Sequence, residues 1–271
     1  MFPSRSEIDW STWSQLIREL SLARQRNINW FSDGYLYGVD SISLSPKSIP
    51  DIEEINNALC HVGWEAVYVE GMIPSDKYVE MQLRKILPIT FSIRDNSSIY
   101  YSVTPDFIHD LMGHVCMMFD ESFRLLIEEW TRKHVSIVPS IIELEAGQAT
   151  VELVEVSKCH NFDIAKVDEK RSKWLYLNQL CDKQKSRFAL MQRFYAWAIE
   201  FGILLADNHP KLLGTASLSS VFEQNRIFNN NVSLRPFHKE ALNTPADYSR
   251  IQDTFFVADS FEEYFDVLQS I

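Results

Sequence analysis

Glycine and proline are scarce in this sequence, with 8 Gly and 10 Pro among 271 residues. Flexible linkers are rich in Gly, Ser or Pro, and no segment has that composition. No stretch of the sequence repeats at a fixed period, which argues against solenoids and propellers. We therefore expect residues 1–271 to form a single domain.

Cysteine and long apolar runs are scarce as well. The four cysteines are too far apart for the close Cys-x-x-Cys pairs of a zinc ribbon and too few for a disulfide scaffold. No stretch approaches the roughly 20 apolar residues of a membrane span, and the N-terminus MFPSRSEIDWSTWSQL lacks the apolar core of a signal peptide. We therefore expect a cytoplasmic protein with no membrane partner.

Positive charge is also in short supply. Lys and Arg total 26 against 37 Asp and Glu, which gives a net charge of −11. Such a surface repels the phosphate backbone of nucleic acids and the headgroups of anionic lipids. We therefore expect no nucleic acid among the partners of this protein.

Apolar residues are abundant, at 46% of positions, which is enough to bury a sizeable core. Their helical spacing predicts a helix over 123–134 and a second helical stretch over about 173–206, broken once at most, that crosses the core. At the C-terminus, Ser260 and Glu263 form a capping-box pattern that predicts a final helix over 261–271.

Strand signals are few and short. Runs of β-branched and aromatic residues predict strands at 64–71, 98–104 and 253–260. Residues 71–75 include Pro74 and predict a turn into a helix that begins near Asp76. The expected fold class is therefore mainly α with a few short β-strands.

The segment TPDFIHDLMGH places two histidines, His109 and His114, five positions apart. Imidazole is the commonest transition-metal ligand, but five residues of a regular α-helix turn the chain by about 140° net, so the two rings would not share a face. A shared metal needs a local deformation or an off-axis position, and Gly113 would permit the deformation because it lacks Cβ. The alternative is that one histidine lies in the core and the other on the surface.

A third ligand would strengthen the case for a metal, and the best candidate is Glu200, an acid inside the apolar run 194–205. A buried, unpaired carboxylate is costly, so Glu200 faces water, finds a polar partner or binds a metal. Two histidines and one carboxylate would suit non-haem Fe(II). The local sequence alone leaves these alternatives open.

Several motifs occur together and in order: WEAVYVEGMIPSDKY, LPITFSIRDN, TPDFIHDLMGH, AWAIEFG, GTASLSSVFE and DTFFVADSFEEYFD. In this order they resemble the pterin-dependent aromatic amino acid hydroxylases, especially the short bacterial phenylalanine hydroxylases. The upstream YLYGVDSISLSPKSIPDIEEINNAL is similar to the N-terminal stretch of that family. The resemblance implies the family's catalytic-domain fold over the whole chain, with no separate regulatory or tetramerisation domain.

The resemblance also implies roles for individual residues. The iron ligands would be His109, His114 and Glu200. The pterin would lie near Asp110 and Tyr195 and on the loop that carries the remaining cofactor contacts, which are Gly71, Met72, Ser75 and Tyr78.

The substrate residues follow from the same resemblance. Arg94 would clamp the carboxylate of the amino acid, since a planar guanidinium suits a two-point contact. Ser219 and Glu223 would steady the iron site and hydrogen-bond around the substrate. Ala196 replaces a tryptophan beside the substrate ring, Ala216 stands where glycine is usual, and Phe201 keeps an aromatic pocket position.

The implied activity is a monooxygenase reaction that uses Fe(II), O2 and a tetrahydropterin, such as tetrahydrobiopterin, to hydroxylate a free aromatic amino acid. We expect phenylalanine as the substrate and a monomer as the active form. The small side chain of Ala196 leaves tryptophan or a broad substrate range as an alternative, unless Trp197 fills the space. A catalytically silent metal- or pterin-binding relative, or a zinc hydrolase with the same ligands, are the rivals from other classes.

Overall fold

The computed structural model describes residues 4–71, 73–94, 99–100, 102, 104–157, 164–183, 186–206, 209–248 and 250–271. The α-helices are α1 (Glu7–Arg26), α2 (Asp33–Ser41), α3 (Ile52–Leu59), α4 (Ser75–Leu83), α5 (Phe107–His109), α6 (Glu121–His134), α7 (Ile141–Ser157), α8 (Ile164–Lys183), α9 (Arg187–Phe194), α10 (Thr215–Leu218), α11 (Val221–Phe228), α12 (His238–Leu242) and α13 (Phe261–Gln269). Two π-helical segments, η4 (Asp110–Val115) and η5 (Tyr195–Glu200), continue α5 and α9. Short 3₁₀ turns are η1 (Ile28–Trp30) and η2 (Cys60–Val62).

Six short strands form two small sheets in the part of the chain that the structure describes. The strands are β1 (Glu65–Val69), β2 (Ile86–Thr90), β3 (Ile203–Ala206), β4 (His209–Leu212), β5 (Ser233–Pro236) and β6 (Thr254–Ala258). Strands β1 and β2 pair in parallel, and α4 connects them. The second sheet has the order β4-β3-β6-β5, in which only the β3–β4 pair is antiparallel.

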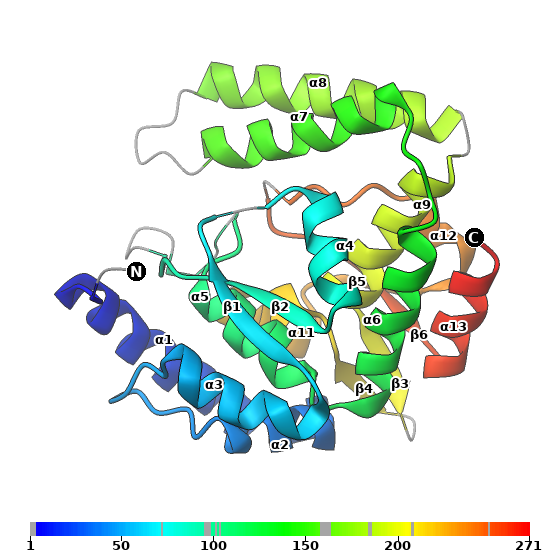
Figure 1. Cartoon of the computed structure of the whole chain (residues 1–271). Helices are drawn as coiled ribbons and strands as arrows, with labels where there is room; N and C mark the ends of the chain where they lie inside the picture. The colour runs from blue at the N-terminus through cyan, green and yellow to red at the C-terminus, as the bar shows by residue number, and fades with distance from the viewer. Residues whose placement is uncertain are drawn as a thin grey trace.

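The core is built around the segment α5–η4. From Phe107 to Met118 almost every side chain is buried, and a helix that is apolar all round belongs in the interior of a domain. The α9–η5 segment lies in the same hydrophobic cluster through Phe194, Trp197 and Ile199. Figure 1 shows these two segments inside a surround of helices, with α1 to α3 on one side and α12 and α13 on the other.

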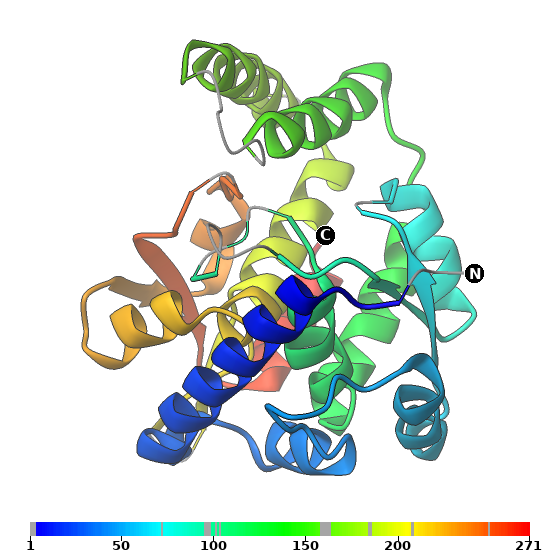
Figure 2. The ribbon, with the colours of Figure 1, turned by 90° about the vertical axis from the view of Figure 1, so that its left-hand side faces the viewer.

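Helices α7 and α8 form a hairpin that stands over the rest of the chain (Figures 1 and 2). The hairpin has a small hydrophobic cluster of its own, in which Ala149 and Leu153 of α7 meet Trp174 and Leu177 of α8. Ala189 of α9 belongs to the same cluster and joins the hairpin to the body. The periodicity of the sequence did not predict α7.

Most of the predicted helices are confirmed. The predicted helix at 123–134 is α6, and α4 begins at Ser75, close to the predicted Asp76. Ser260 does cap α13 by accepting from the Glu263 N–H, although the Glu263 carboxylate accepts from the N–H of Asp259 rather than closing a full capping box.

The prediction of one helical stretch over 173–206 is wrong at its end. Residues 173–183 belong to α8 and 187–200 to α9 and η5, but 203–206 form strand β3, because they pair with β4 and β6. The segment that crosses the core is therefore α9–η5.

Two of the three predicted strands are confirmed, as β1 and β6. The third, at 98–104, is wrong, because its described residues are not in a strand, while residues 98, 101 and 103 lie outside the described part. The fold class, mainly α with a few short strands, is confirmed.

The thiols of Cys60, Cys116 and Cys181 are free, and Cys159 lies outside the described residues. Among the helices that the structure describes, none combines the length and apolar character needed to span a bilayer.

Candidate active site

The two histidines of the TPDFIHDLMGH segment share a site because the helix that carries them is deformed. His109 ends α5, and the next six residues form the π-helical segment η4. In a π-helix each hydrogen bond runs from residue i to i+5, so a residue five positions along lies over the first. The expected deformation is confirmed, and the ring centroids of His109 and His114 are 5.1 Å apart.

Glu200 is presented by a second π-helical segment. In η5 the N–H of Phe201 donates to the carbonyl of Ala196, an i+5 bond of 2.9 Å. Tyr195 and Glu200 are themselves five residues apart, so this winding brings both side chains to one side of the helix. The two deformed segments, η4 and η5, supply His114 and Glu200, and His109 lies at the end of α5, directly before η4.

The three side chains form a compact donor cluster. The Nε2 atom of His114 lies 3.5 Å from Glu200 Oε1, and the Nε2 atom of His109 lies 3.7 Å from Glu200 Oε2. One nitrogen or oxygen from each residue lies within 4.8 Å of the others. Two imidazoles and one carboxylate at such separations can hold one ion and leave positions on it open, which is the arrangement of non-haem Fe(II) oxygenases.

Helix α10 supports the ligands from behind. Thr215 donates from Oγ1 to Glu200 Oε2 at 2.8 Å, and the Ser219 hydroxyl lies 3.3 Å from His109 Nδ1. A Cβ on Gly113 would lie 2.4 Å from the carbonyl oxygen of Thr215, so only glycine allows η4 and α10 to approach this closely. Such supporting groups fix the orientation of metal ligands.

The electrostatics of the cluster suit a cation. Burial alone would raise the pKa of Glu200, but the hydrogen bond and charge of His114 outweigh it and lower that pKa to about 2. Burial lowers the pKa of His109, which keeps its imidazole neutral and able to bind a metal. Burial also opposes the charged form of His114, but Glu200 outweighs this effect and leaves its pKa raised.

Two further carboxylates border the donor cluster. Asp110, buried in η4, accepts from the N–H of Thr90 at 2.6 Å, which ties the site to the end of β2. Asp106 caps α5 by accepting from the His109 N–H, and it also accepts from Nε and Nη2 of Arg94 at 2.9 and 2.7 Å. Arg94 is therefore a buried residue with a fixed side chain, and not a surface arginine.

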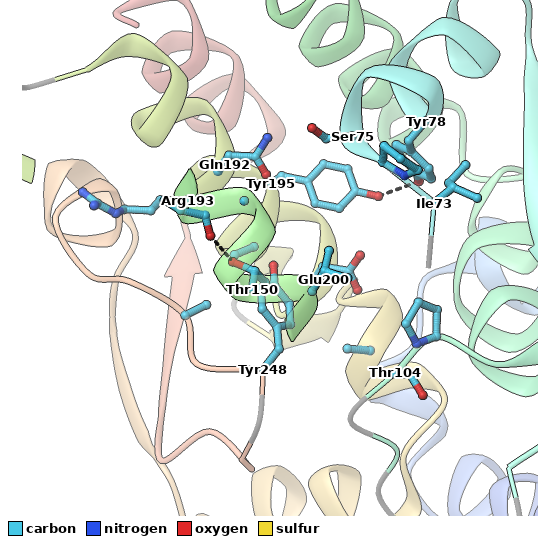
Figure 3. Close-up of a pocket in the computed structure, with 18 of the residues that line it drawn as sticks. Ile73, Ser75, Tyr78, Thr104, Thr150, Gln192, Arg193, Tyr195, Glu200 and Tyr248 are labelled. Atoms are coloured by element: carbon cyan, nitrogen blue, oxygen red, sulfur yellow. Dashed lines mark hydrogen bonds between the residues drawn. The ribbon is translucent and has the colours of Figure 1, made fainter. Parts of the chain in front are cut away.

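The cluster opens into a cavity of about 550 Å³. On one side lie the predicted pterin residues Gly71, Ser75 and Tyr78, with Asp110 and Tyr195; Met72 lies outside the described residues. The hydroxyl groups of Tyr78 and Tyr195 are 2.6 Å apart. Figure 3 shows the two side chains pointing toward each other, with Glu200 nearby. Gly71 has φ = 62°, a left-handed conformation that favours glycine in this loop.

The predicted substrate residues divide into two groups. Arg94, Ala196, Phe201, Ala216 and Ser219 line the cavity. Glu223 does not; it is buried in α11, where Oε2 accepts from the hydroxyl of Ser217. Ser219 ends α10, so this pair does not lie on one helix face.

Trp197 does not fill the space beside Ala196. Its indole N–H donates to the carbonyl of Thr244, and its ring packs on Phe256 with the centroids 5.0 Å apart. Trp197 is not among the residues that line the cavity. Ala196 therefore lines the cavity without Trp197 in front of it.

Sequence reasoning missed several residues of the site. Thr215 lies in the quoted GTASLSSVFE motif, and Asp106 precedes α5 as its N-cap, so the sequence did carry a capping signal for Asp106. Nothing in the sequence indicated that Thr150 and Trp174 of the hairpin would line the same cavity.

The fold and the donor cluster together define a metalloenzyme with two histidines and one carboxylate as ligands. The sequence profile of the biopterin-dependent aromatic amino acid hydroxylases matches residues 4–137 and 172–271. The chain therefore belongs to this family, which uses an aromatic amino acid, a reduced pterin and O2.

Individual relatives agree with this assignment. The phenylalanine-4-hydroxylase of Chromobacterium violaceum is 23% identical over 262 residues, covering 95% of this chain and 72% of the relative. That of Pseudomonas aeruginosa is 23% identical over 270 residues, covering 97% and 82%.

Solved structures share the fold. The C. violaceum enzyme with bound iron(III) and 7,8-dihydrobiopterin has a TM-score of 0.73 at 22% identity, covering 98% of this chain and 81% of that one. The phenylalanine hydroxylase of Legionella pneumophila has a TM-score of 0.74 at 19% identity, covering 100% and 89%. The predicted family and the predicted cofactors, iron and a reduced pterin, are confirmed.

Proposed function

We propose that this chain hydroxylates the ring of a free aromatic amino acid, with phenylalanine as a substrate, and that His109, His114 and Glu200 hold the catalytic Fe(II). The observation that carries the proposal is the donor cluster formed by the end of α5 and the two π-helical segments, at the wall of a cavity that also contains a buried arginine. When bound, iron and the reduced pterin supply the electrons that reduce O2.

The proposed task of Arg94 is to bind the carboxylate of the amino acid. Asp106 accepts hydrogen bonds from Nε and from one N–H of Nη2. Nη1 and the second N–H of Nη2 are left for a two-point contact with the substrate carboxylate. Burial alone would raise the pKa of Asp106, but the charge and hydrogen bonds of Arg94 outweigh it and lower that pKa. The ion pair thus stays charged and keeps the guanidinium in one orientation.

The proposed pterin residues form a wall that is both apolar and hydrogen-bonding. Tyr78 and Tyr195 orient each other through their hydroxyl groups, and the Trp130 ring packs on Tyr195 with the centroids 4.6 Å apart. The aromatic ring of Tyr78 would stack on the pteridine, while Asp110 would accept hydrogen bonds from it. These contacts would position the cofactor beside the iron ligands and exclude water.

The direct test incubates iron-loaded protein with tetrahydrobiopterin, O2 and one of phenylalanine, tyrosine or tryptophan, and identifies products by mass spectrometry. We expect tyrosine from phenylalanine, and no product when the pterin is omitted. Binding of iron and pterin without any hydroxylated product would favour the silent relative. Hydrolytic activity with zinc and no need for pterin would favour a hydrolase.

A broad substrate range is the second candidate, because Ala196 and the orientation of Trp197 leave open space in the cavity. Product from tryptophan in the same assay would support it.

The location and the assembly of the protein complete the proposal. The net charge of −11 supports the absence of nucleic acid from its partners, and we propose a cytoplasmic monomer. Analytical ultracentrifugation would test the oligomeric state.

A further inference from the structure

The α7–α8 hairpin overhangs the cavity, and the sequence profile of the family does not match most of it. The unmatched residues 138–171 include all of α7 and the first part of α8. Figure 2 shows the hairpin above the main body of the chain. This part of the cavity wall is therefore not covered by the family profile.

Helix α7 contributes part of the cavity wall, with Glu143, Leu144, Ala146, Gly147, Gln148, Thr150 and Val151. Among these, Leu144, Gly147, Gln148 and Val151 are spaced i, i+3, i+4 and i+7 and form one stripe. The first three are exposed, so protein atoms do not cover this stripe. A Cβ added to Gly147 would meet no atom within 4 Å, which shows that this glycine leaves space in front of the helix.

The hairpin is anchored on the side of the cavity that we assign to the amino acid. Arg171 of α8 pairs with Asp247 at 3.4 Å, in the segment 245–248 that lines the cavity. In that segment Tyr248 packs on Phe201, with their ring centroids 5.7 Å apart. The hairpin also shares its hydrophobic cluster with Ala189, on the helix that leads to Ala196.

We propose that the α7–α8 hairpin is a substrate-specificity element. Because Gly147 has no side chain, it leaves room for a large aromatic ring, and the size of the residue at position 147 sets the size of the ring that the site accepts. The inference rests on the proposed function, because it assigns this wall to the amino acid. Apart from Glu143, the residues that α7 adds to this wall are small, apolar or neutral, which suits an uncharged aromatic ring larger than that of phenylalanine. Tryptophan is the natural amino acid with such a ring.

The test introduces bulk at Gly147. Gly147→Phe should lower the ratio of tryptophan to phenylalanine kcat/KM about 10-fold or more, because an apolar pocket discriminates by at least this factor when space for one group is lost. The KM for tetrahydrobiopterin should stay unchanged. Calorimetry with the iron-loaded protein, without O2, should show the same loss in tryptophan affinity relative to phenylalanine.

The matched control is Glu145→Phe, which adds a similar ring on an exposed position of α7 outside the cavity wall. It should leave the ratio unchanged. If Gly147→Phe does not fold by circular dichroism, Gly147→Leu gives a smaller step with the same expected direction.

Three results would overturn the inference: an unchanged ratio in both Gly147 variants, an equal change in the control, or a rise in the pterin KM alone. Failure of the wild type to bind tryptophan would also contradict it. The absence of any hydroxylated product from phenylalanine would instead contradict the proposed function.

Discussion

Replacing Gly113 by alanine tests whether the contact between η4 and α10 holds the iron site together. The new Cβ would lie 2.4 Å from the Thr215 carbonyl oxygen and 2.8 Å from the Thr215 Cβ. Ordinary van der Waals contact begins near 3.4 Å, so the two segments must separate by about 1 Å. The atom in the way is backbone and cannot rotate aside.

That separation is large enough to break the support of the ligands. The hydrogen bond from Thr215 to Glu200 is 2.8 Å long, and a 1 Å displacement would take it beyond hydrogen-bonding distance. Overpacking a core costs about 1–3 kcal/mol, while replacing glycine by alanine in a helix returns at most about 1 kcal/mol. The net expectation is a loss of up to about 2 kcal/mol in the free energy of unfolding, with iron affinity about 10–100-fold weaker.

Urea denaturation of the iron-free protein measures the first quantity, and competition with a chelator of known affinity measures the second. Gly147→Ala is the matched control, since an added Cβ there meets nothing within 4 Å. This control should raise the free energy of unfolding by about 0.5–1 kcal/mol. The reasoning is refuted if Gly113→Ala is as stable as the wild type and binds iron equally well.

Three further predictions concern individual side chains. His114→Ala should abolish iron retention, measured by metal analysis after dialysis, and any retained stoichiometric iron would contradict its role as a ligand. Arg94→Lys should raise the Kd for phenylalanine about 10-fold or more while leaving the Kd for pterin unchanged in calorimetry; equal losses for both would argue against a carboxylate clamp. Burial raises the pKa of Glu223 from 4.5 to about 7, so its contribution to stability is fully present below pH 4.5 and is lost as the pH rises toward and through 7. Glu223→Gln should therefore remove part of the fall in stability over this range, and an unchanged pH profile in urea denaturation would count against the raised pKa.

Proline explains part of what sequence reasoning missed in the fold. Residues 86–90 contain Pro88, and a proline usually argues against a central strand because it lacks the N–H for the ladder. In the structure β2 pairs only with β1, so one of its edges is free of partners in the described sheet. Pro210 and Pro236 lie in β4 and β5, which are the two edge strands of the second sheet. The sequence did not predict these segments as strands, because the position of a strand at the edge of a sheet is decided only when the sheet assembles.

The proposed metal ligands show a different limit of prediction from the sequence. The spacing of His109 and His114 does not place them on one face of a regular α-helix, and the periodicity of the sequence does not predict a π-helical segment. Ordered motifs shared with a known family identified both histidines and Glu200 where local spacing left alternatives open. Thr215 and Asp106 act through contacts with residues 12 to 15 positions away, and these contacts exist only in the folded chain.

Helix α7 of the hairpin could not be predicted from the sequence either, because one of its faces packs against α8 and another lines the cavity. Periodicity arguments assume one apolar stripe toward the core and one polar stripe toward water. In α7, Ala149 and Leu153 pack in the hairpin cluster, while Leu144 and Val151 line the cavity. Apolar residues thus occur on two sides of the helix, and the amphipathic pattern is lost. The family profile does not match α7 either, so neither the pattern nor the resemblance could predict it. A helix that contacts both a partner helix and a ligand has apolar residues on two faces, so its periodicity does not predict it. In this chain that helix, α7, forms one wall of the proposed substrate site.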